Sequence, residues 1–365
     1  MTWKQAGVSG AGRSVFWIAM NFPFSLPSMF QQQTIQSAID SASPGDTITV
    51  AKGTYAEQIL ITKNGIKLVG QNGATIVPPP TAVTNGCSGL AGPLPPPATS
   101  GDTQAGICIL GAGVVLGDWP GSEHRKIASY GAPVEDVQVK GFTIRGFSGL
   151  NVAVVNAKNA EVRENTLTDG GAYGSLTVGS VGTVVTRNTV NSSALSFIGI
   201  CMDDRSDVRV SANTISEMVI GLCVQTDGAD VRGNTVRNCC VGAFVDPGIR
   251  GASLTHNQIG PTNPFCTFGF VSGIRIAGAV STNAQHNTIT GQTDFNFPDG
   301  HGPSQSFGAG IAVYDFDAKG AKATGNVVDF NKLSGNDIDI DTAFTGTNEI
   351  KHNTCTTPST LCSKQ

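Results

Sequence analysis

The chain has 365 residues, of which only 14% are charged, and its formal net charge is -4 at pH 7. This balance excludes a global basic field of the kind that attracts nucleic acid or an anionic membrane. The 46 glycines, with many Val, Ile, Thr and Asn residues, favour a β-rich protein with many turns. Because no apolar run is long enough to cross a bilayer, we expect no membrane span.

Residues 1–33 form a leader with the order of a secretory signal. Lys4 and Arg13 precede an apolar stretch at 15–30, as a basic segment precedes an apolar one in such signals. Asn21 and two prolines interrupt the stretch, so the alternative is an apolar segment that packs on the domain. Nine cysteines are many for a cytosolic protein, and we therefore expect secretion.

The segment 34–71 predicts a short helix followed by strands. Ile35, Ala38 and Ile39 give a helix at 34–41 one apolar face. Such a helix can cover the open end of a stack of repeats. The first strands are expected at Thr47–Val50, Ile59–Ile61 and 66–69.

The cysteines bracket loops. Cys87 and Cys108 enclose a Pro-rich segment at 78–97, which we interpret as a lateral loop, and Cys355 and Cys362 enclose a short loop near the end of the chain. Both pairs are predicted disulfides. The adjacent Cys239 and Cys240 have Cys266 downstream. An odd count leaves at least one cysteine free or bonded to another molecule.

A phrase of Asn, Thr and an aliphatic residue recurs along the chain. Most steps between its asparagines are 21–25 residues, with longer steps later, and such a period is typical of a solenoid. Polar and apolar residues alternate beside each phrase, which indicates strands. The recurring residues are Asn165, Asn188, Asn213, Asn234, Asn257, Asn287, Asn326 and Asn353, with Gly141 expected in the same place one coil earlier.

We predict a structural role for these asparagines. Asn tolerates the left-handed backbone of a tight bend. Stacked in successive coils, the amides can also donate to and accept from one another in a ladder. None of these residues is assigned to catalysis.

The stretch "IQSAIDSASPGDTITVAKGTY" at 35–55, followed by the repeated coils, resembles the pectate-lyase-like superfamily. The resemblance is nearest to its branch of carbohydrate-binding and sugar-hydrolase repeats. It implies an all-β protein, a single-stranded right-handed parallel β-helix with a short N-terminal capping helix. The β-helix is expected at 34–356, between the leader at 1–33 and a tail at 357–365. The superfamily holds lyases, hydrolases, epimerases, tail-spike adhesins and non-catalytic members, so the fold leaves the chemistry open.

Five coils share a strand that begins with Gly, and alternation predicts which of its side chains face outward. Asp203, Gln225 and Asp246 then form one exterior column. Arg275 lies one coil further on, and Tyr314 one beyond. Cys201 and Cys223 occupy the same outward place in adjacent coils, where we favour free thiols over a bond because parallel neighbours suit a disulfide poorly.

Two long insertions, 260–270 and 291–308, precede this strand and are rich in Phe. Long loops on one side of a solenoid often mark its binding face. The predicted substrate-binding residues are Gln225, Phe244, Phe268, Phe270, Phe297 and Phe307. The alternative for the phenylalanines is that they bury one another.

The predicted catalytic residues are Asp203, Asp246, Arg275, Tyr314 and His301. Asp203 and Asp246 could serve as an acid and a base with a water between them. Alternatively, carboxylates including Asp204 and Asp227 could hold a calcium ion. The resemblance implies that calcium would then acidify a uronate and that Arg275 would act as base or charge stabiliser. The remaining alternative is that these aspartates are solvated surface residues.

Three functions stay open. The first is a secreted carbohydrate-active enzyme, a lyase, epimerase or hydrolase acting on a uronate-containing polysaccharide. The second is an isomerase or cyclase acting on a small apolar metabolite under the Phe-rich loops. The third is a non-catalytic glycan-binding protein. Calcium is the one cofactor considered, and no oligomeric state is predicted.

Overall fold

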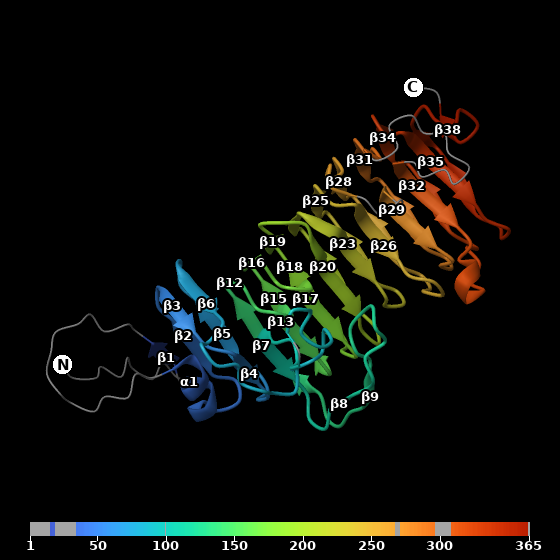
Figure 1. The fold of residues 1–365 in the computed structure, drawn as a ribbon. Coiled ribbons are helices and arrows are strands. Elements are labelled where there is room, and N and C mark those ends of the chain that lie inside the picture. The colour runs from blue at the N-terminus through green and yellow to red at the C-terminus, as the bar shows by residue number, and fades with distance from the viewer. Residues whose placement is uncertain (1–14, 19–33, 99, 267–270, 296–307, 364–365) are drawn as a thin grey trace, which may run out of the picture.

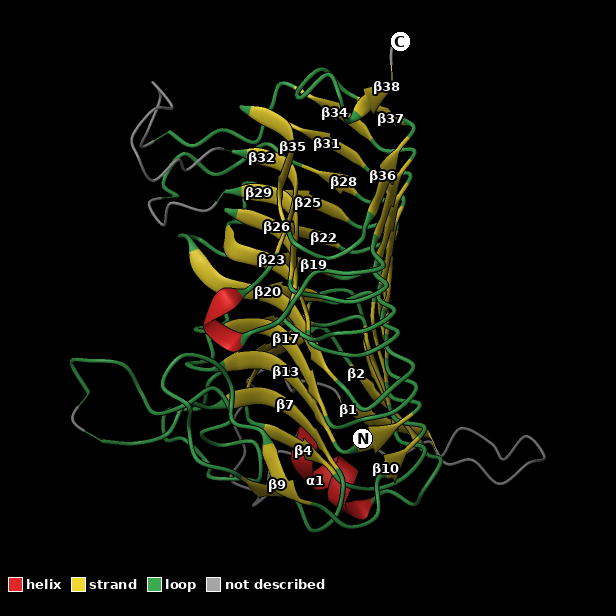
Figure 2. Ribbon diagram, turned by 90° about the vertical axis from the view of Figure 1, so that its right-hand side faces the viewer, coloured by secondary structure: helices red, strands yellow, loops and turns green. Residues whose placement is uncertain are grey.

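The computed structural model describes residues 15–18, 34–98, 100–266, 271–295 and 308–363, and its strands form three long parallel sheets wound as one β-helix (Figure 1). Most coils contribute one strand to each sheet, and the strands of these three sheets pair with their counterparts one coil away. Figure 2 shows the strands of successive coils stacked along the axis. The predicted all-β, right-handed parallel β-helix is confirmed.

Two of the sheets have twelve strands each. Sheet A consists of β1 (Val15–Ile18), β2 (Thr47–Val50), β5 (Lys67–Gly70), β11 (Gln138–Lys140), β15 (Glu161–Arg163), β18 (Val184–Thr186), β21 (Arg209–Ser211), β24 (Asp230–Arg232), β27 (Ser253–Thr255), β30 (Asn283–Gln285), β33 (Val327–Asp329) and β36 (Glu349–Lys351). Sheet B consists of β3 (Gly53–Ala56), β6 (Ala74–Val77), β12 (Thr143–Arg145), β16 (Thr166–Thr168), β19 (Thr189–Asn191), β22 (Thr214–Ser216), β25 (Thr235–Arg237), β28 (Gln258–Ile259), β31 (Thr288–Thr290), β34 (Lys332–Ser334), β37 (Asn353–Thr354) and β38 (Cys362–Ser363).

Sheet C has ten strands and carries the candidate site. It consists of β4 (Ile59–Ile61), β7 (Ala105–Leu110), β13 (Leu150–Val155), β17 (Tyr173–Val178), β20 (Ser196–Asp203), β23 (Met218–Val224), β26 (Val241–Val245), β29 (Ser272–Ala277), β32 (Ala309–Tyr314) and β35 (Ile338–Ala343). The remaining elements are the pair β10 (Val134–Glu135) and β14 (Ala157–Lys158), the antiparallel pair β8 (Val115–Leu116) and β9 (Ile127–Ser129), and a 3-10 turn η1 (Asp317–Lys319).

The predicted capping helix is present as α1 (Ile35–Ser41) at the N-terminal end of the solenoid (Figure 1). Thr34 caps it, because its hydroxyl accepts a hydrogen bond from the N–H of Ser37 at 3.0 Å. The helix buries Ile35, Ala38 and Ile39. Most of the predicted leader, 1–14 and 19–33, lies outside the described residues, whereas β38 extends coil pairing into the segment assigned to the tail.

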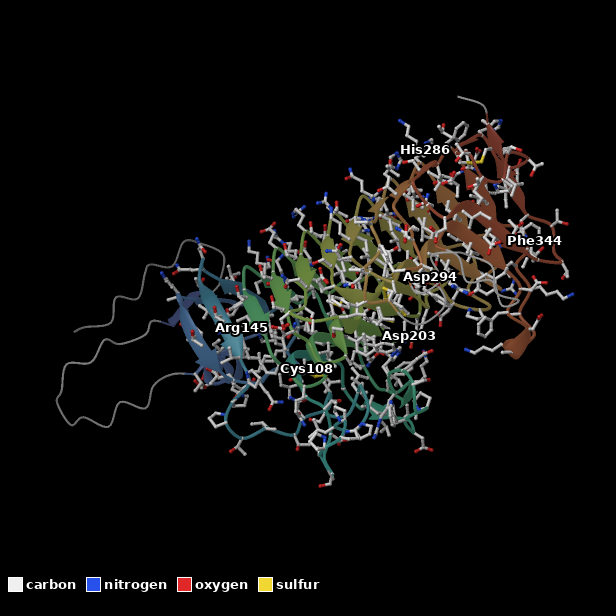
Figure 3. The ribbon with its side chains drawn as sticks, turned by 45° about the horizontal axis from the view of Figure 1, so that its top comes forward. Cys108, Arg145, Asp203, His286, Asp294 and Phe344 are labelled. Atoms are coloured by element: carbon white, nitrogen blue, oxygen red, sulfur yellow. A yellow bond between two sulfur atoms is a disulfide. The ribbon has the colours of Figure 1, made fainter. Side chains whose placement is uncertain are left out.

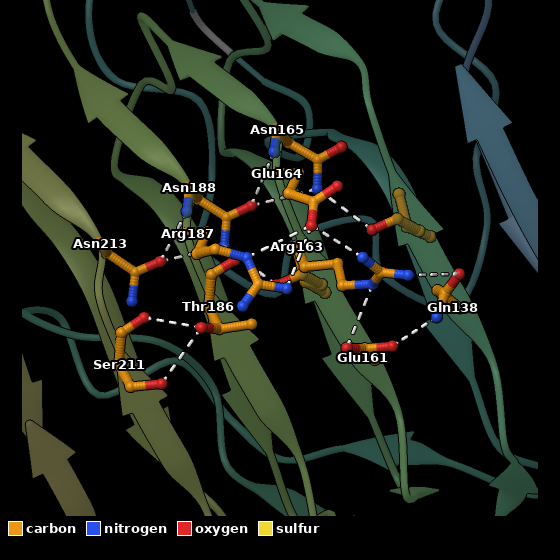
Figure 4. A network of polar contacts seen from close by, with 12 residues as sticks. Gln138, Glu161, Arg163, Glu164, Asn165, Thr186, Arg187, Asn188, Ser211 and Asn213 are labelled. Atoms are coloured by element: carbon orange, nitrogen blue, oxygen red, sulfur yellow. Dashed lines mark hydrogen bonds and ion pairs between the residues drawn. The ribbon is translucent and has the colours of Figure 1, made fainter. Parts of the chain in front are cut away.

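The asparagine ladder lies between sheets A and B. In each rung the side-chain oxygen accepts from the backbone N–H and the amide of the preceding asparagine, as Figure 4 shows for Asn165, Asn188 and Asn213. Each amide also donates to a backbone carbonyl in the preceding coil. The members are Asn165, Asn188, Asn213, Asn234, Asn257, Asn287, Asn331 and Asn353. Two donors and the acceptor of each buried amide are thus satisfied.

Two details of the predicted ladder are wrong. Asn326 precedes sheet A and bonds Asn348 instead, because an insertion lengthens this coil and makes Asn331 the true member. The left-handed residue is also the one before each asparagine, as at Glu164 and Arg187, with φ near +55°. Gly141 takes that left-handed place, and Phe142 takes the place of the asparagine.

Two apolar cores lie on opposite faces of sheet C. Inside the coils, aliphatic side chains from all three sheets form the main core, and the inward residues predicted from alternation, such as Ile200, Leu222 and Val245, are fully buried there. Outside, a second cluster covers β7, β13 and β17 and includes Leu150, Leu176, Cys201 and Cys223. The loops 78–104 and 111–133 cover this outer cluster, since Leu90 and Leu116 pack in it.

Three disulfides are present among the nine cysteines. The predicted bonds Cys87–Cys108 and Cys355–Cys362 are confirmed, and the third joins Cys240 to Cys266. Cys201, Cys223 and Cys239 are free and buried, which confirms the preference for thiols at the stacked pair. In the described part of the chain, no helix is long and apolar enough to cross a membrane.

We predict that Asn234→Leu destabilises the protein. Asn234 is fully buried, and the change removes the hydrogen bonds to Asn213 and Asn257 and leaves their groups unpaired. Each unsatisfied buried group costs about 1–3 kcal/mol, so thermal unfolding should shift down by several degrees. Asn283→Leu is the control, because this side chain is exposed on β30. Equal melting temperatures for the two variants would contradict the ladder's role.

Candidate functional site

Strand pairing places the predicted exterior column on the outer face of sheet C. The pairs Met202 to Val224 and Val224 to Val245 put Asp203, Gln225 and Asp246 at successive rungs just beyond these strands. Tyr314 belongs to the same column, since Ala277, its partner on β29, follows Asp246 in register. Arg275 instead pairs with Phe244, in the neighbouring column that contains Cys201 and Cys223. Figure 3 labels Asp203 on this side of the solenoid.

A pocket of about 340 Å³ lies on this face. It crosses five successive strands of sheet C, from β20 to β32, and its walls are mainly aromatic and aliphatic. The lining residues are Glu123, Phe197, Ile198, Ile220, Cys223, Gln225, Phe244, Asp246, Pro247, Arg275, Tyr314, Phe316 and Lys319. Of the predicted residues, it therefore brings together Gln225, Phe244, Asp246, Arg275 and Tyr314.

Gln225 links two carboxyl groups at the polar end of the pocket. Its amide nitrogen donates to Asp246 Oδ2 at 2.8 Å and to Glu123 Oε2 at 2.9 Å. Its amide oxygen accepts from Lys126 Nζ at 2.8 Å. One side chain therefore holds two acids close together and contacts a cation on its other side.

Asp203 lies beside this group and binds two residues of the loop 111–133. Its Oδ2 accepts from His124 Nε2 and from Lys126 Nζ, both at 2.9 Å. His124 is fully buried, with its ring edge against Tyr173 at a centroid distance of 6.0 Å. These contacts fasten the loop to sheet C. Asp203 itself does not line the pocket, and its role is to hold the loop residues His124 and Lys126 in place.

The loop residues Glu123, His124 and Lys126 were missed in the sequence analysis. A loop residue has no repeat phase, so alternation and Asn spacing say nothing about where it lies. One signal was present: the run Glu123–Lys126 is fully polar and carries several charges in a chain with few of them. This run also lies between two strands, β8 and β9, outside the repeated coils.

Asp246 has a raised pKa in the pocket. Burial, followed by the nearby charge of Glu123, raises the pKa of Asp246 to about 7, against the opposing hydrogen bond from Gln225 and the positive charges of Lys319 and Lys126. Asp246 is therefore partly protonated near neutrality. Such a carboxyl group can donate a proton to a bound molecule.

Arg275 and Tyr314 also line the pocket and contact each other. The guanidinium carbon lies 4.6 Å from the centre of the Tyr314 ring, and Arg275 Nε donates to the phenol oxygen. Burial raises the pKa of Tyr314, which keeps the phenol neutral. The pair places a positive charge in the same pocket as Asp246 and Glu123.

The two predicted metal ligands do not lie with the column. Asp204 is buried in the bend after β20, where its Oδ1 accepts from Ser180 N–H at 3.1 Å and burial raises the pKa of its carboxyl to about 6. Asp227 is exposed and accepts from Arg250 N–H at 2.7 Å. No three His, Cys, Asp or Glu side chains are grouped to hold a metal ion within the described ranges. A calcium ion here stays a prediction.

Several predicted residues fall outside the described part of the chain. They are Phe268, Phe270, Phe297, His301 and Phe307. Cys223 is one that the prediction did not place in the site: its thiol lies at the base of the pocket beside Cys201. Contact with Cys201, and then burial, raise the pKa of Cys223, so this thiol stays protonated.

Comparison with known proteins supports the fold. The family described as right handed beta helix region matches residues 103–259. No curated protein sequence matches the chain.

Three solved structures illustrate the likeness. A family 28 exopolygalacturonase from Yersinia enterocolitica is 13% identical, with a TM-score of 0.54 over 89% of this chain and 73% of that one. The Dettilon tailspike protein is 14% identical, with a TM-score of 0.52 over 89% of this chain and 62% of the other. A DFA-IIIase from Arthrobacter chlorophenolicus A6 is 11% identical, with a TM-score of 0.51 over 88% and 86%.

At these identities the likeness concerns the backbone and not the side chains that do chemistry. The three parallel sheets, the asparagine ladder and the matched region all agree on one architecture. The chain therefore has the right-handed parallel β-helix fold.

Proposed function

We propose that the protein is a carbohydrate-active enzyme that cleaves a glycosidic bond in the sheet C pocket, with Asp246 as proton donor. The observation that carries the proposal is the pair of carboxyl groups of Asp246 and Glu123, joined through the Gln225 amide. Hydrolysis of a glycosidic bond uses two such groups, one protonated and one ionised. Burial and the charge of Glu123 give Asp246 the protonated role.

The walls suit a sugar ring with a negative charge. Phe197, Phe244 and Phe316 offer apolar faces on which a ring can stack. Arg275 and Lys319 add positive charge, which favours a uronate over a neutral sugar. The three similar structures include an exopolygalacturonase, which supports a glycan substrate at the level of the fold.

The pocket favours the end of a glycan chain. Loops 78–104 and 111–133 cover the outer face of sheet C from β7 to β17, and Glu123 of the second loop lines the pocket. A glycan that runs along the axis over β32, β29 and β26 would meet this loop at Glu123. We therefore expect release of short products from a chain end.

A second candidate is an isomerase or cyclase that protonates a small apolar metabolite. Its support is the mainly aromatic and aliphatic lining of the pocket. A lyase or epimerase would instead need a base for the C5 proton of a uronate.

The three disulfides favour an oxidising compartment, so we propose a location outside the cell.

Activity should depend on both carboxyl groups. We expect Asp246→Asn and Glu123→Gln to lower kcat by roughly a hundredfold or more, because each removes an acid–base group. The measurement is release of reducing ends from a panel of uronate and neutral polysaccharides. Absorbance of unsaturated products, measured in parallel, separates hydrolysis from a lyase reaction.

The matched control is Asp207→Asn, an exposed position where φ is +57°, which Asn also tolerates. Its activity should equal that of the unmodified protein. If Asp246→Asn keeps full activity on the best substrate, the proton donor is a different residue. If the polymer loses viscosity before short products appear, cleavage is internal and the chain-end expectation is wrong.

The pKa of Asp246 also predicts how stability changes with pH. An unfolded Asp titrates near about 3.9, so between this value and about 7 the folded state binds more protons than the unfolded state. Stability therefore falls as pH rises through this window. Asp246→Asn removes the cost of ionising this buried carboxyl group. At pH 8 the variant should therefore be more stable than the unmodified protein by about 1–3 kcal/mol, and at pH 4 the two should differ little. Denaturant unfolding at both pH values measures this, and a pH-independent difference would argue against the raised pKa.

A further inference from the structure

We propose that Lys126 is a positioning residue: it fixes the amide orientation of Gln225, so that the nitrogen of the amide faces Asp246 and Glu123. The inference deepens the proposed function, because these two carboxyl groups are the proposed acid–base pair. It assigns a role to the loop 111–133, which the strand repeat does not contain.

Donors and acceptors determine which atom of the Gln225 amide faces Lys126. A lysine ammonium carries three donors and no acceptor, so the Gln225 atom 2.8 Å from Lys126 Nζ must be the oxygen. The nitrogen then points the other way, and its two hydrogens match the two carboxyl oxygens at 2.8 and 2.9 Å. A flipped amide would set its nitrogen against the ammonium and its oxygen against two acceptors.

Lys126 is itself held in place. Asp203 Oδ2 accepts from Lys126 Nζ, and the same oxygen accepts from His124 Nε2. Since a carboxylate oxygen accepts, His124 carries its proton on Nε2. His124 is fully buried, whereas about half of the Lys126 side chain is exposed. The buried histidine and Asp203 therefore anchor a cation that would otherwise be mobile.

The orientation matters for proton binding at Asp246. A hydrogen bond donated to a carboxylate stabilises its ionised form, so Gln225 moderates the effect of burial. Asp246 faces Glu123 and Lys126 from the lateral loop, Lys319 from η1, Tyr314 from β32, and the stacked thiols of Cys201 and Cys223. Of the two lysines among these groups, Lys126 is the one that also bonds Gln225. Loss of the Lys126 side chain should remove a positive charge near Asp246 and also remove the hydrogen bond that holds the Gln225 amide.

The test is a double-mutant cycle read by NMR titration of the Asp246 carboxyl carbon, with Asp246→Asn identifying the signal. In Lys126→Met we expect the proton affinity of Asp246 to rise at least about threefold. In a Gln225→Leu background the same Lys126→Met change should act through charge alone and give a smaller rise. Lys126→Arg should restore the original titration, because a guanidinium can donate to the same oxygens.

Two controls complete the design. Lys319→Met removes a charge near Asp246 without a contact to Gln225, so its effect should be the same in both backgrounds. Lys332→Met, an exposed lysine on β34, should change nothing. Circular dichroism checks that each variant is folded, and Gln225→Met replaces Gln225→Leu if that variant is not.

An equal rise from Lys126→Met with and without Gln225 would overturn the proposal, because Lys126 would then act by charge alone. No rise in either background would overturn it as well. The titration needs no substrate, so an inactive protein with the expected cycle would reject the proposed function and leave the positioning role intact. With a substrate in hand, the basic limb of the kcat profile should move to higher pH in Lys126→Met and return in Lys126→Arg.

Discussion

The in-register stacking of one coil on the next is the constraint on which the rest of this structure depends. Every strand of the three long sheets pairs in parallel with its counterpart, and the buried asparagines repeat the same hydrogen bonds from Asn165 to Asn353. A ladder of this kind tolerates no slip, since a shift by one residue would leave buried amides unpaired and turn every strand side chain to the other face. The long insertions are therefore confined to loops, where they do not disturb the register.

The same register builds the site. Because successive coils repeat in phase, Asp203, Gln225, Asp246 and Tyr314 fall in one line on the outer face of sheet C. Gln225 occupies the rung between Asp203 and Asp246. Its amide donates to Asp246 and accepts from Lys126. A rigid stack of strands holds such side chains more precisely than a loop could.

The outer apolar cluster explains why the pocket lies where it does. Loops 78–104 and 111–133 bury the outer face of β7, β13 and β17, and the disulfide Cys87–Cys108 ties the first loop to β7. The sheet becomes accessible where this cover ends, and there Glu123 meets the column. Burial and the charge of Glu123 raise the pKa of Asp246, so the loop supplies a second acid whose charge favours the protonated form of the first one.

The sequence by itself determined the repeat, the capping helix, the inward and outward sides of the strands, two of the three disulfides and the place of Asp203, Gln225 and Asp246 in one exterior column, whereas Arg275 lies in the neighbouring column. These features depend on local periodicity, which strand geometry converts directly into position. It misplaced Asn326, because an insertion hides the phase of the coil, and it put the left-handed residue one position late. Only the tertiary structure decided that Glu123, His124 and Lys126 join the column, that the pKa of Asp246 is raised, and that Asp204 and Asp227 lie apart from the column. Contacts between a loop and a sheet some 80 to 100 residues away leave no periodic trace in the chain, and burial is a property of the packed molecule.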